Sequence, residues 1–184
     1  MQDHRPNDLL LLAGKILAIL MQIGMAIGAA VLAIISIALV IFQGKVIEEY
    51  ADKVGDPTVI FPIFLLIAVA LIGLAIVCAL FIFFGKLRQI IGTVGEGDPF
   101  QPANAQRLSM MGWLMLGVQL ALIPATVIGT RLASYADDMD DVHLTVDSGF
   151  ELDLTGILIV VLLFILSRVF KHGAAMREDL EGTV

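Results

Sequence analysis

The sequence predicts an all-α integral membrane protein with four transmembrane helices, both termini in the cytoplasm, and a small extracytoplasmic β-hairpin between helices three and four. Three observations predict this fold class: the chain is 59% hydrophobic and only 16% charged, four long runs carry almost no charge, and the basic residues gather on one side of those runs. A water-soluble core in a chain of 184 residues cannot bury so much apolar surface. Part of the solvent is therefore lipid.

Each of the four apolar runs is long enough, or nearly so, to cross the hydrocarbon as a helix. The backbone has to be helical there, because lipid offers its polar groups no hydrogen-bond partner. The fourth run is the shortest and includes Arg168, whose guanidinium we expect to reach the headgroups. The predicted spans of this single membrane domain are residues 16–42, 59–85, 108–130 and 154–170.

The distribution of charge predicts the orientation of the chain. An even number of spans puts both termini and the loop 86–107 on one side, with the loop 131–153 on the other. Eight basic residues lie on the side of the termini, whereas the opposite side holds only Lys45, Lys53 and Arg131. The positive-inside rule then places the termini and the loop 86–107 in the cytoplasm.

The outer loop 131–153 contains the pattern on which the β-hairpin rests. The stretch VHLTVDSGFELDL alternates apolar and polar residues around an Asp-Ser-Gly turn, which is typical of two short strands. Its apolar residues at period two are Val142, Leu144 and Val146, then Phe150, Leu152 and Leu154. The acidic run just before it, Asp137 to Asp141, lacks the spacing of a calcium-binding loop and is interpreted as a solvated face.

The stretch GEGDPFQPANAQRL, residues 95–108, is a polar turn between two very apolar segments. Glycine and proline in its first half end the helix that continues from the second span. Pro102 suits the first turn of the next helix with Gln101 as a weak cap, or else Asn104 caps a helix that begins at Ala105. Phe100 is an aromatic residue in this polar turn. It either packs back onto Ile90 and Ile91 or points outward as an anchor for a partner.

Residues that carry chemistry are scarce. The chain has one cysteine, Cys78, and its three histidines are far apart in sequence, so there is no thiol pair, haem ligand pair or metal-ligand spacing. No serine or cysteine has a plausible base beside it in the sequence. We therefore expect no enzyme activity, no catalytic residue, no metal and no cofactor.

Four residues inside the spans predict helix packing. Gln22 and Gln119 are positioned to hydrogen-bond across helices, and Gly24 with Gly28 forms a GxxxG step that allows close helix approach. Packing within the chain and homodimerisation explain the GxxxG step equally well. A proton-coupled carrier would need a charged group within the bilayer, and the first three spans contain no Asp, Glu, Lys or His.

Two segments carry a resemblance to a known family. They are FGKLRQIIGTVGEGDPFQPANAQRL, with Asp98, Pro99, Phe100, Asn104, Arg107 and Leu108, and the tail RVFKHGAAMREDLEGTV, with Phe170, Gly173, Thr183 and Val184. With these segments the chain resembles a family of bacterial four-helix inner-membrane proteins catalogued as a domain of unknown function (DUF). It departs from the family pattern at Gln101 and Ala103, where small hydroxyl and acidic residues are more common.

The resemblance implies a multi-pass protein of the bacterial inner membrane and a protein partner. Members of the family are often encoded beside a small Cro/CI-type helix-turn-helix regulator, which implies a role in holding or inhibiting that regulator at the membrane. The expected partner-binding residues are Arg88, Phe100, Asn104 and Arg107. We expect no direct binding to nucleic acid. The alternative for these residues is a structural role, and the alternative function is a small-molecule transporter or export component that uses Gln22 and Gln119.

Overall fold

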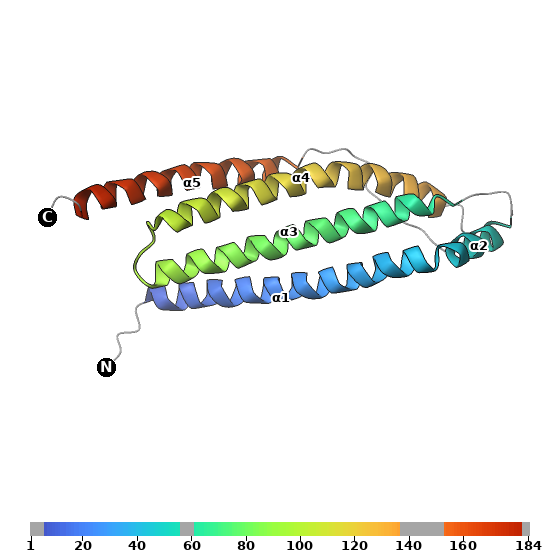
Figure 1. Cartoon of the computed structure of the whole chain (residues 1–184), viewed down its shortest axis with the longest axis horizontal. Coiled ribbons are helices and arrows are strands. Elements are labelled where there is room, and N and C mark those ends of the chain that lie inside the picture. The colour runs from blue at the N-terminus through green and yellow to red at the C-terminus, as the bar shows by residue number, and fades with distance from the viewer. Residues whose placement is uncertain (1–5, 56–60, 137–152, 182–184) are drawn as a thin grey trace. The chain divides into compact units, whose positions relative to one another are not determined.

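The computed structural model describes residues 6–55, 61–136 and 153–181, and all regular structure in these ranges is helical. Its five helices are α1 (Pro6–Ile41), α2 (Gln43–Val54), α3 (Ile63–Gly95), α4 (Pro102–Ala136) and α5 (Leu154–Glu181), shown in Figure 1. Four of them, α1, α3, α4 and α5, are long and apolar enough to cross a membrane. By length and composition, the chain is a multi-pass membrane protein.

The long helices extend beyond the predicted spans. Helix α3 continues to Gly95 and α4 begins at Pro102, so only residues 96–101 of the predicted loop 86–107 are not helical. Helix α1 begins well before the predicted start of the first span, at Pro6, and α5 continues to Glu181. These extensions carry polar and charged residues, so the helices are longer than their hydrophobic parts.

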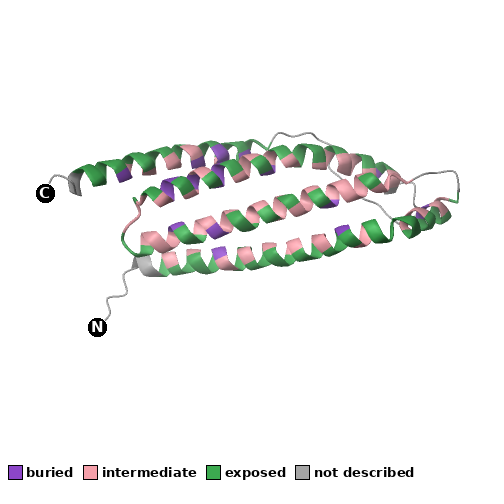
Figure 2. Cartoon of the chain, viewed as in Figure 1, coloured by how far each residue is buried: buried purple, intermediate pink, exposed green. Residues whose placement is uncertain are grey.

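The apolar side chains of the long helices point outward. Only 6% of the residues in the most apolar stretch of α1, and the same share in α3, are buried inside the protein. Figure 2 shows exposed residues along the whole length of both helices. A protein in water would bury such surface, whereas a bilayer solvates it at no cost.

The predicted β-hairpin is wrong as a part of the fold class, because the described residues contain no strand. Leu154, which the alternating pattern assigns to the second strand, is the first residue of α5. The Asp153 carboxylate accepts the backbone N–H of Gly156 at 3.0 Å and so caps the helix there. The helix therefore begins at Leu154, although the alternating pattern favours a strand there. The rest of the hairpin, Val142 to Leu152, lies outside the described residues.

A fifth helix also corrects the predicted fold class. No helix was predicted between the first two spans, yet Gln43–Val54 forms α2. Its apolar residues Val46, Tyr50 and Val54 recur every four positions and form one face, while charged residues cover the opposite face. Gly55, with φ of 71°, ends the helix in the left-handed conformation that glycine adopts without strain.

The chain forms two compact units. The first, here called the loop unit, contains the described residues within 1–26, 78–119 and 153–184. The second, here called the aromatic unit, contains those within 27–77 and 120–152. Helices α1, α3 and α4 contribute to both units, whereas α5 belongs to the loop unit alone, and each unit has its own set of packed side chains.

The loop unit packs around a small core between α3, α4 and α5. Ile90, Leu108, Met111 and Leu163 are its buried residues, and each of the three helices supplies at least one. Gly112 of α4 lies against the ring of Phe164, where an added Cβ would be 3.1 Å from the nearest ring carbon. Buried residues gather where α4 and α5 lie side by side (Figure 2).

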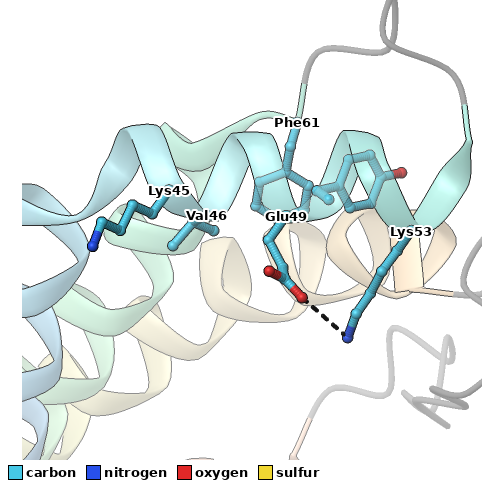
Figure 3. A pocket seen from close by; sticks show the side chains of 6 residues that line it. Lys45, Val46, Glu49, Lys53 and Phe61 are labelled. Atoms are coloured by element: carbon cyan, nitrogen blue, oxygen red, sulfur yellow. Dashed lines mark ion pairs between the residues drawn. The ribbon is translucent and has the colours of Figure 1, made fainter.

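The aromatic unit is held by three rings. Tyr50 of α2 is only 2% exposed, and its ring centroid lies 4.8 Å from that of Phe61 and 6.4 Å from that of Tyr135. The Tyr50 hydroxyl donates to the carbonyl oxygen of Tyr135 at 3.4 Å. Beside the rings lies a pocket of about 370 Å³. There Glu49 and Lys53 point toward each other on the exposed face of α2, with 3.9 Å between Oε1 and Nζ (Figure 3).

Candidate functional site

The turn between α3 and α4 begins with a glycine-based helix end. The backbone N–H of Gly97 donates to the carbonyl of Val94, and that of Asp98 donates to the carbonyl of Thr93, both at 3.1 Å. These two bonds are the pattern of a Schellman motif, which requires the left-handed conformation at its penultimate residue. Gly97 has φ of 81° and satisfies that requirement. The chain therefore leaves α3 in one defined direction.

Asn104 holds the turn together from inside. Its side chain is 0% exposed, although it stands in the first turn of α4. Its Nδ2 donates to Thr93 Oγ1 at 2.7 Å and to the Pro99 carbonyl at 2.9 Å, while its Oδ1 accepts from Arg107 Nη1 at 2.7 Å. One amide thus joins the end of α3, the middle of the turn and the start of α4. Its hydrogen-bonding capacity is used within the turn.

Helix α4 begins at Pro102, as the first of the two capping alternatives predicted. Proline suits this position because the N–H it lacks would have had no partner there. Gln101, immediately before it, donates through Nε2 to Asp98 Oδ2 at 3.0 Å. The backbone N–H of Asn104 bonds back to the Gln101 carbonyl at 2.9 Å. Asn104 is therefore inside the helix and does not cap it.

Phe100 lies on α5, a contact that neither sequence alternative included. Its ring centroid is 5.4 Å from that of Phe170, and the rings are tilted by 43°. A Cβ added to Gly173 would stand 2.6 Å from Phe100 Cδ1, so the ring occupies the space that a glycine leaves open. Phe100 nevertheless remains 42% exposed. The Phe100 ring therefore packs against α5 and still leaves part of its surface exposed.

Two polar contacts fasten α5 to the same region. Arg177 of α5 forms an ion pair with Asp98 of the turn. The Ser167 hydroxyl donates to the backbone carbonyl of Ala105 at 2.8 Å. The loop junction, as we name it, consists of Thr93, Asp98, Phe100, Asn104, Arg107, Phe170, Gly173 and Arg177.

A groove of about 410 Å³ lies between the start of α4 and the last turns of α5. Its floor is made of small residues, among them Ala105 and Ser109 of α4 and Ala174 of α5. Lys171 and Glu178 stand on its α5 side and are exposed. Because Ala174 directly follows the glycine under Phe100, the groove and Phe100 lie at the same end of α5.

The four predicted partner-binding residues have different surroundings. Phe100 is partly exposed, Arg107 is half-buried against Asn104, and Asn104 is enclosed. Arg88 is exposed on α3, and the contacts of the described residues do not draw it into the loop junction. Sequence reasoning missed Thr93 and Arg177 as members of this site. The sequence signal for the ion pair between Arg177 and Asp98 was weak: an acidic residue in the turn and basic residues in the tail.

The family comparison matches the part of the chain that contains the whole loop junction. The family model described as "Protein of unknown function (DUF2975)" matches residues 56–184. The chain belongs to this family. The DUF2975 match includes α3, α4 and α5 and begins just after α2. No curated protein and no solved structure matches the chain significantly.

The residues on which the sequence resemblance rests meet in space. Asp98, Phe100 and Asn104 come from the turn, whereas Phe170 and Gly173 come from a segment about 70 residues later, yet they form one contact network. Among the described residues, no group of three His, Cys, Asp or Glu side chains is placed to hold a metal ion. The loop junction is thus built for packing and hydrogen bonding around an exposed aromatic ring.

The predicted packing residues have separate surroundings. Gln22 of α1 lies against Gly85 of α3, where an added Cβ would be 3.0 Å from its Nε2. Gln119 of α4 donates to Asp153 Oδ2 at 3.0 Å. Gly28 faces α3, since its added Cβ would be 3.6 Å from Val77 Cγ1. Gly24 has no atom within 4 Å of its added Cβ, so its face is open.

Proposed function

We propose that this DUF2975 protein is a non-enzymatic membrane anchor that binds a small cytosolic helix-turn-helix transcription regulator through the exposed side of its loop junction. The observation that carries the proposal is Phe100, an aromatic side chain that is 42% exposed at a polar turn and packs on Gly173 and Phe170 of α5. An aromatic ring fixed before binding loses little conformational entropy when a partner covers it.

The groove between the start of α4 and the end of α5 supports this proposal. Its small residues leave about 410 Å³ open next to two exposed charged side chains, Lys171 and Glu178. An apolar side chain of the partner fits into such a space, while charges at the rim select partners with complementary charge. Asn104 and Arg107 act in this proposal by holding the turn, and Phe100 with Lys171 makes the contact.

Orientation is part of the proposal, because a cytosolic regulator can reach the loop junction only from the cytoplasm. An impermeant maleimide applied to intact cells that produce Glu96→Cys in a Cys78→Ser background tests it. Glu96 is exposed in the turn. We expect labelling only after the cells are permeabilised. Labelling in intact cells would exclude the proposed partner.

Binding is tested by co-purification in detergent with the helix-turn-helix protein encoded beside this gene. We expect recovery of the regulator to fall with Phe100→Ala and with Lys171→Glu. The matched control is Phe64→Ala, because Phe64 is 67% exposed on α3 and belongs to the aromatic unit. Equal recovery from all four proteins, or the absence of such a neighbouring gene product, contradicts the proposal.

Arg107→Ala separates binding from architecture. This variant removes the donor to Asn104 Oδ1 and leaves that buried oxygen without a protein partner. We expect a lower unfolding temperature in detergent together with lower recovery of the regulator. Phe100→Ala, in contrast, is expected to reduce recovery more than it reduces the unfolding temperature.

Transport of a small molecule remains the alternative function. The sequence linked it to Gln22 and Gln119, which contact Gly85 and Asp153 respectively. Whole-cell uptake by the double variant Gln22→Leu with Gln119→Leu tests it. We expect unchanged uptake on the anchor proposal.

A further inference from the structure

Helices α1 and α3 meet through two contacts that fix how they lie along each other. Gly14 of α1 faces Ile91 of α3, where an added Cβ would be 3.5 Å from Ile91 Cδ1. Further along α1, Gln22 lies against Gly85 of α3, with its Nε2 3.0 Å from the added Cβ. All four residues belong to the loop unit. The segments between the two contacts therefore run beside each other in opposite directions.

Each of these segments contains an exposed basic residue, Lys15 on α1 and Arg88 on α3. Arg88 stands one turn before Ile91, on the face of α3 that meets α1. Lys15 stands one turn before Ala18, which is only 2% exposed, so Lys15 borders the packed face of its own helix. The two cations thus lie at neighbouring heights along one helix contact.

The same two residues stand at the end of an apolar run. Lys15 directly precedes the first predicted span, and Arg88 follows the second by three residues. The phosphate groups of a bilayer lie at this level, next to the hydrocarbon. Phe81 stands two turns before Arg88 on the same face of α3 and is 38% exposed. A lipid with its phosphate at Arg88 has an exposed apolar ring below it for an acyl chain.

No acidic side chain neutralises these cations in the part of the chain that the structure describes. Neither Lys15 nor Arg88 forms an ion pair there, whereas Arg177 of the same unit does. Along their own helices, the nearest acidic residues are Asp8 and Glu96, seven and eight residues away. That separation is about 10 Å or more along the helix axis. The two positive charges are therefore complementary to an anion from outside the protein.

We propose that Lys15 and Arg88 form a binding site for the phosphate of an anionic phospholipid. The guanidinium of Arg88 binds phosphate oxygens in a fork, and the ammonium of Lys15 adds a second positive charge. A zwitterionic lipid fits less well, because its own cation would stand beside two others. This inference is independent of the proposed regulator binding, since neither residue belongs to the loop junction, and it holds for either orientation of the chain.

Lipid retention by the full-length protein in a neutral detergent tests the proposal. The protein is mixed with phosphatidylglycerol or with phosphatidylcholine of the same acyl chains, and bound lipids are counted by native mass spectrometry. We expect severalfold higher retention of phosphatidylglycerol. Lys15→Ala and Arg88→Ala each remove one charge and should weaken its binding by about fivefold. The double variant should lose the preference for the anionic lipid.

Lys86→Ala is the matched control. Lys86 carries the same charge on the same helix, but its position two residues before Arg88 puts it on another face of α3. This variant should retain phosphatidylglycerol as the unchanged protein does. Arg88→Lys keeps the charge without the fork and should bind with intermediate strength. The unfolding temperature without added lipid verifies that each variant is folded.

Two results would overturn the proposal. Equal retention of the two lipids would remove the selectivity for an anionic headgroup. Equal losses from Lys86→Ala and Arg88→Ala would show a general positive surface in place of a site.

Glycerol 3-phosphate distinguishes a lipid from a soluble phosphate. We expect phosphatidylglycerol to raise the unfolding temperature and the soluble compound to leave it unchanged. An equal rise with both would show that the site takes a free phosphate, and the assignment to a lipid would be wrong.

Discussion

The loop junction and the aromatic contact in the other unit both secure the end of a helix, but they use different forces. Both helix ends carry a glycine with positive φ, Gly97 after α3 and Gly55 after α2. Beyond that glycine, the loop junction relies on directional bonds to one buried amide, Asn104. The aromatic unit instead packs the ring of Tyr50 against two other rings.

This difference predicts different tolerance to substitution. A buried amide specifies one arrangement of donors and acceptors, and an apolar replacement leaves its former partners unsatisfied. Contacts between rings stabilise the protein mainly through the apolar area that they bury. Another large apolar side chain in place of a ring restores part of that area. The loop junction is therefore the less tolerant of the two.

The largest expected effect is that of Asn104→Leu compared with Tyr50→Leu. Asn104→Leu leaves the Pro99 carbonyl and the Arg107 guanidinium without their partner and should destabilise the protein by about 3 kcal/mol. Tyr50→Leu retains an apolar side chain in the ring contact and should cost about 1 to 2 kcal/mol. Unfolding of both variants in mild detergent measures the difference. Equal losses would contradict the comparison.

Gly173→Ala sharpens the description of the loop junction. Its Cβ would come within 2.6 Å of Phe100 Cδ1, so the ring must leave its place on α5, at a cost of about 1 to 3 kcal/mol. Gly92→Ala is the matched control in α3, since no atom lies within 4 Å of its Cβ. Alanine should stabilise the helix there. The unfolding temperatures of the two variants should shift in opposite directions.

The two helix-ending glycines provide a comparison of equal local strain. Gly97→Ala and Gly55→Ala each force a side chain into a left-handed conformation, at about 1 kcal/mol. No atom lies within 4 Å of either Cβ, so strain is the only local cost. If α3 must end in one direction for the loop junction to form, only Gly97→Ala should also reduce recovery of the regulator. A reduction by both variants would show a general loss of stability.

The smallest expected effect is that of Glu49→Gln. Its ion pair with Lys53 spans 3.9 Å between side chains that are 73% and 51% exposed. Water and salt screen such a pair, which contributes less than about 0.5 kcal/mol. The unfolding temperature should therefore remain the same in low and in high salt. A large change would show that α2 depends on its charged face as well as on its rings.

The parts of the fold that could be predicted from the sequence are those that depend on local composition. The apolar stretches of α1, α3, α4 and α5 are visible as runs without charge, because lipid solvates each helix separately. The periodicity of Val46, Tyr50 and Val54 also carried the signal for α2, although it was missed in a short charged segment. The stretch before α5 led to a wrong prediction, because its alternation of apolar and polar residues is typical of a strand. In the structure, the Asp153 carboxylate caps the start of a helix there.

The candidate site was predicted only in part, for a different reason. Phe100, Asn104 and Arg107 stand out in a polar turn, and the turn could be read as a unit. Their roles depend on Thr93 before the turn and on Gly173 after it, about 80 residues apart in the chain. No local pattern shows which residue an aromatic ring will contact or which amide will be enclosed.

The sequence by itself determined that this chain spans a membrane, where its apolar helices lie and which turn carries the polar signature. Hydropathy acts on each segment alone, so a single sequence contains that information. Only the tertiary structure decided that Asn104 is enclosed while Phe100 stays exposed, and that Asp153 meets Gln119. These outcomes depend on how helices distant in sequence align side by side, which sets the partner that each side chain reaches.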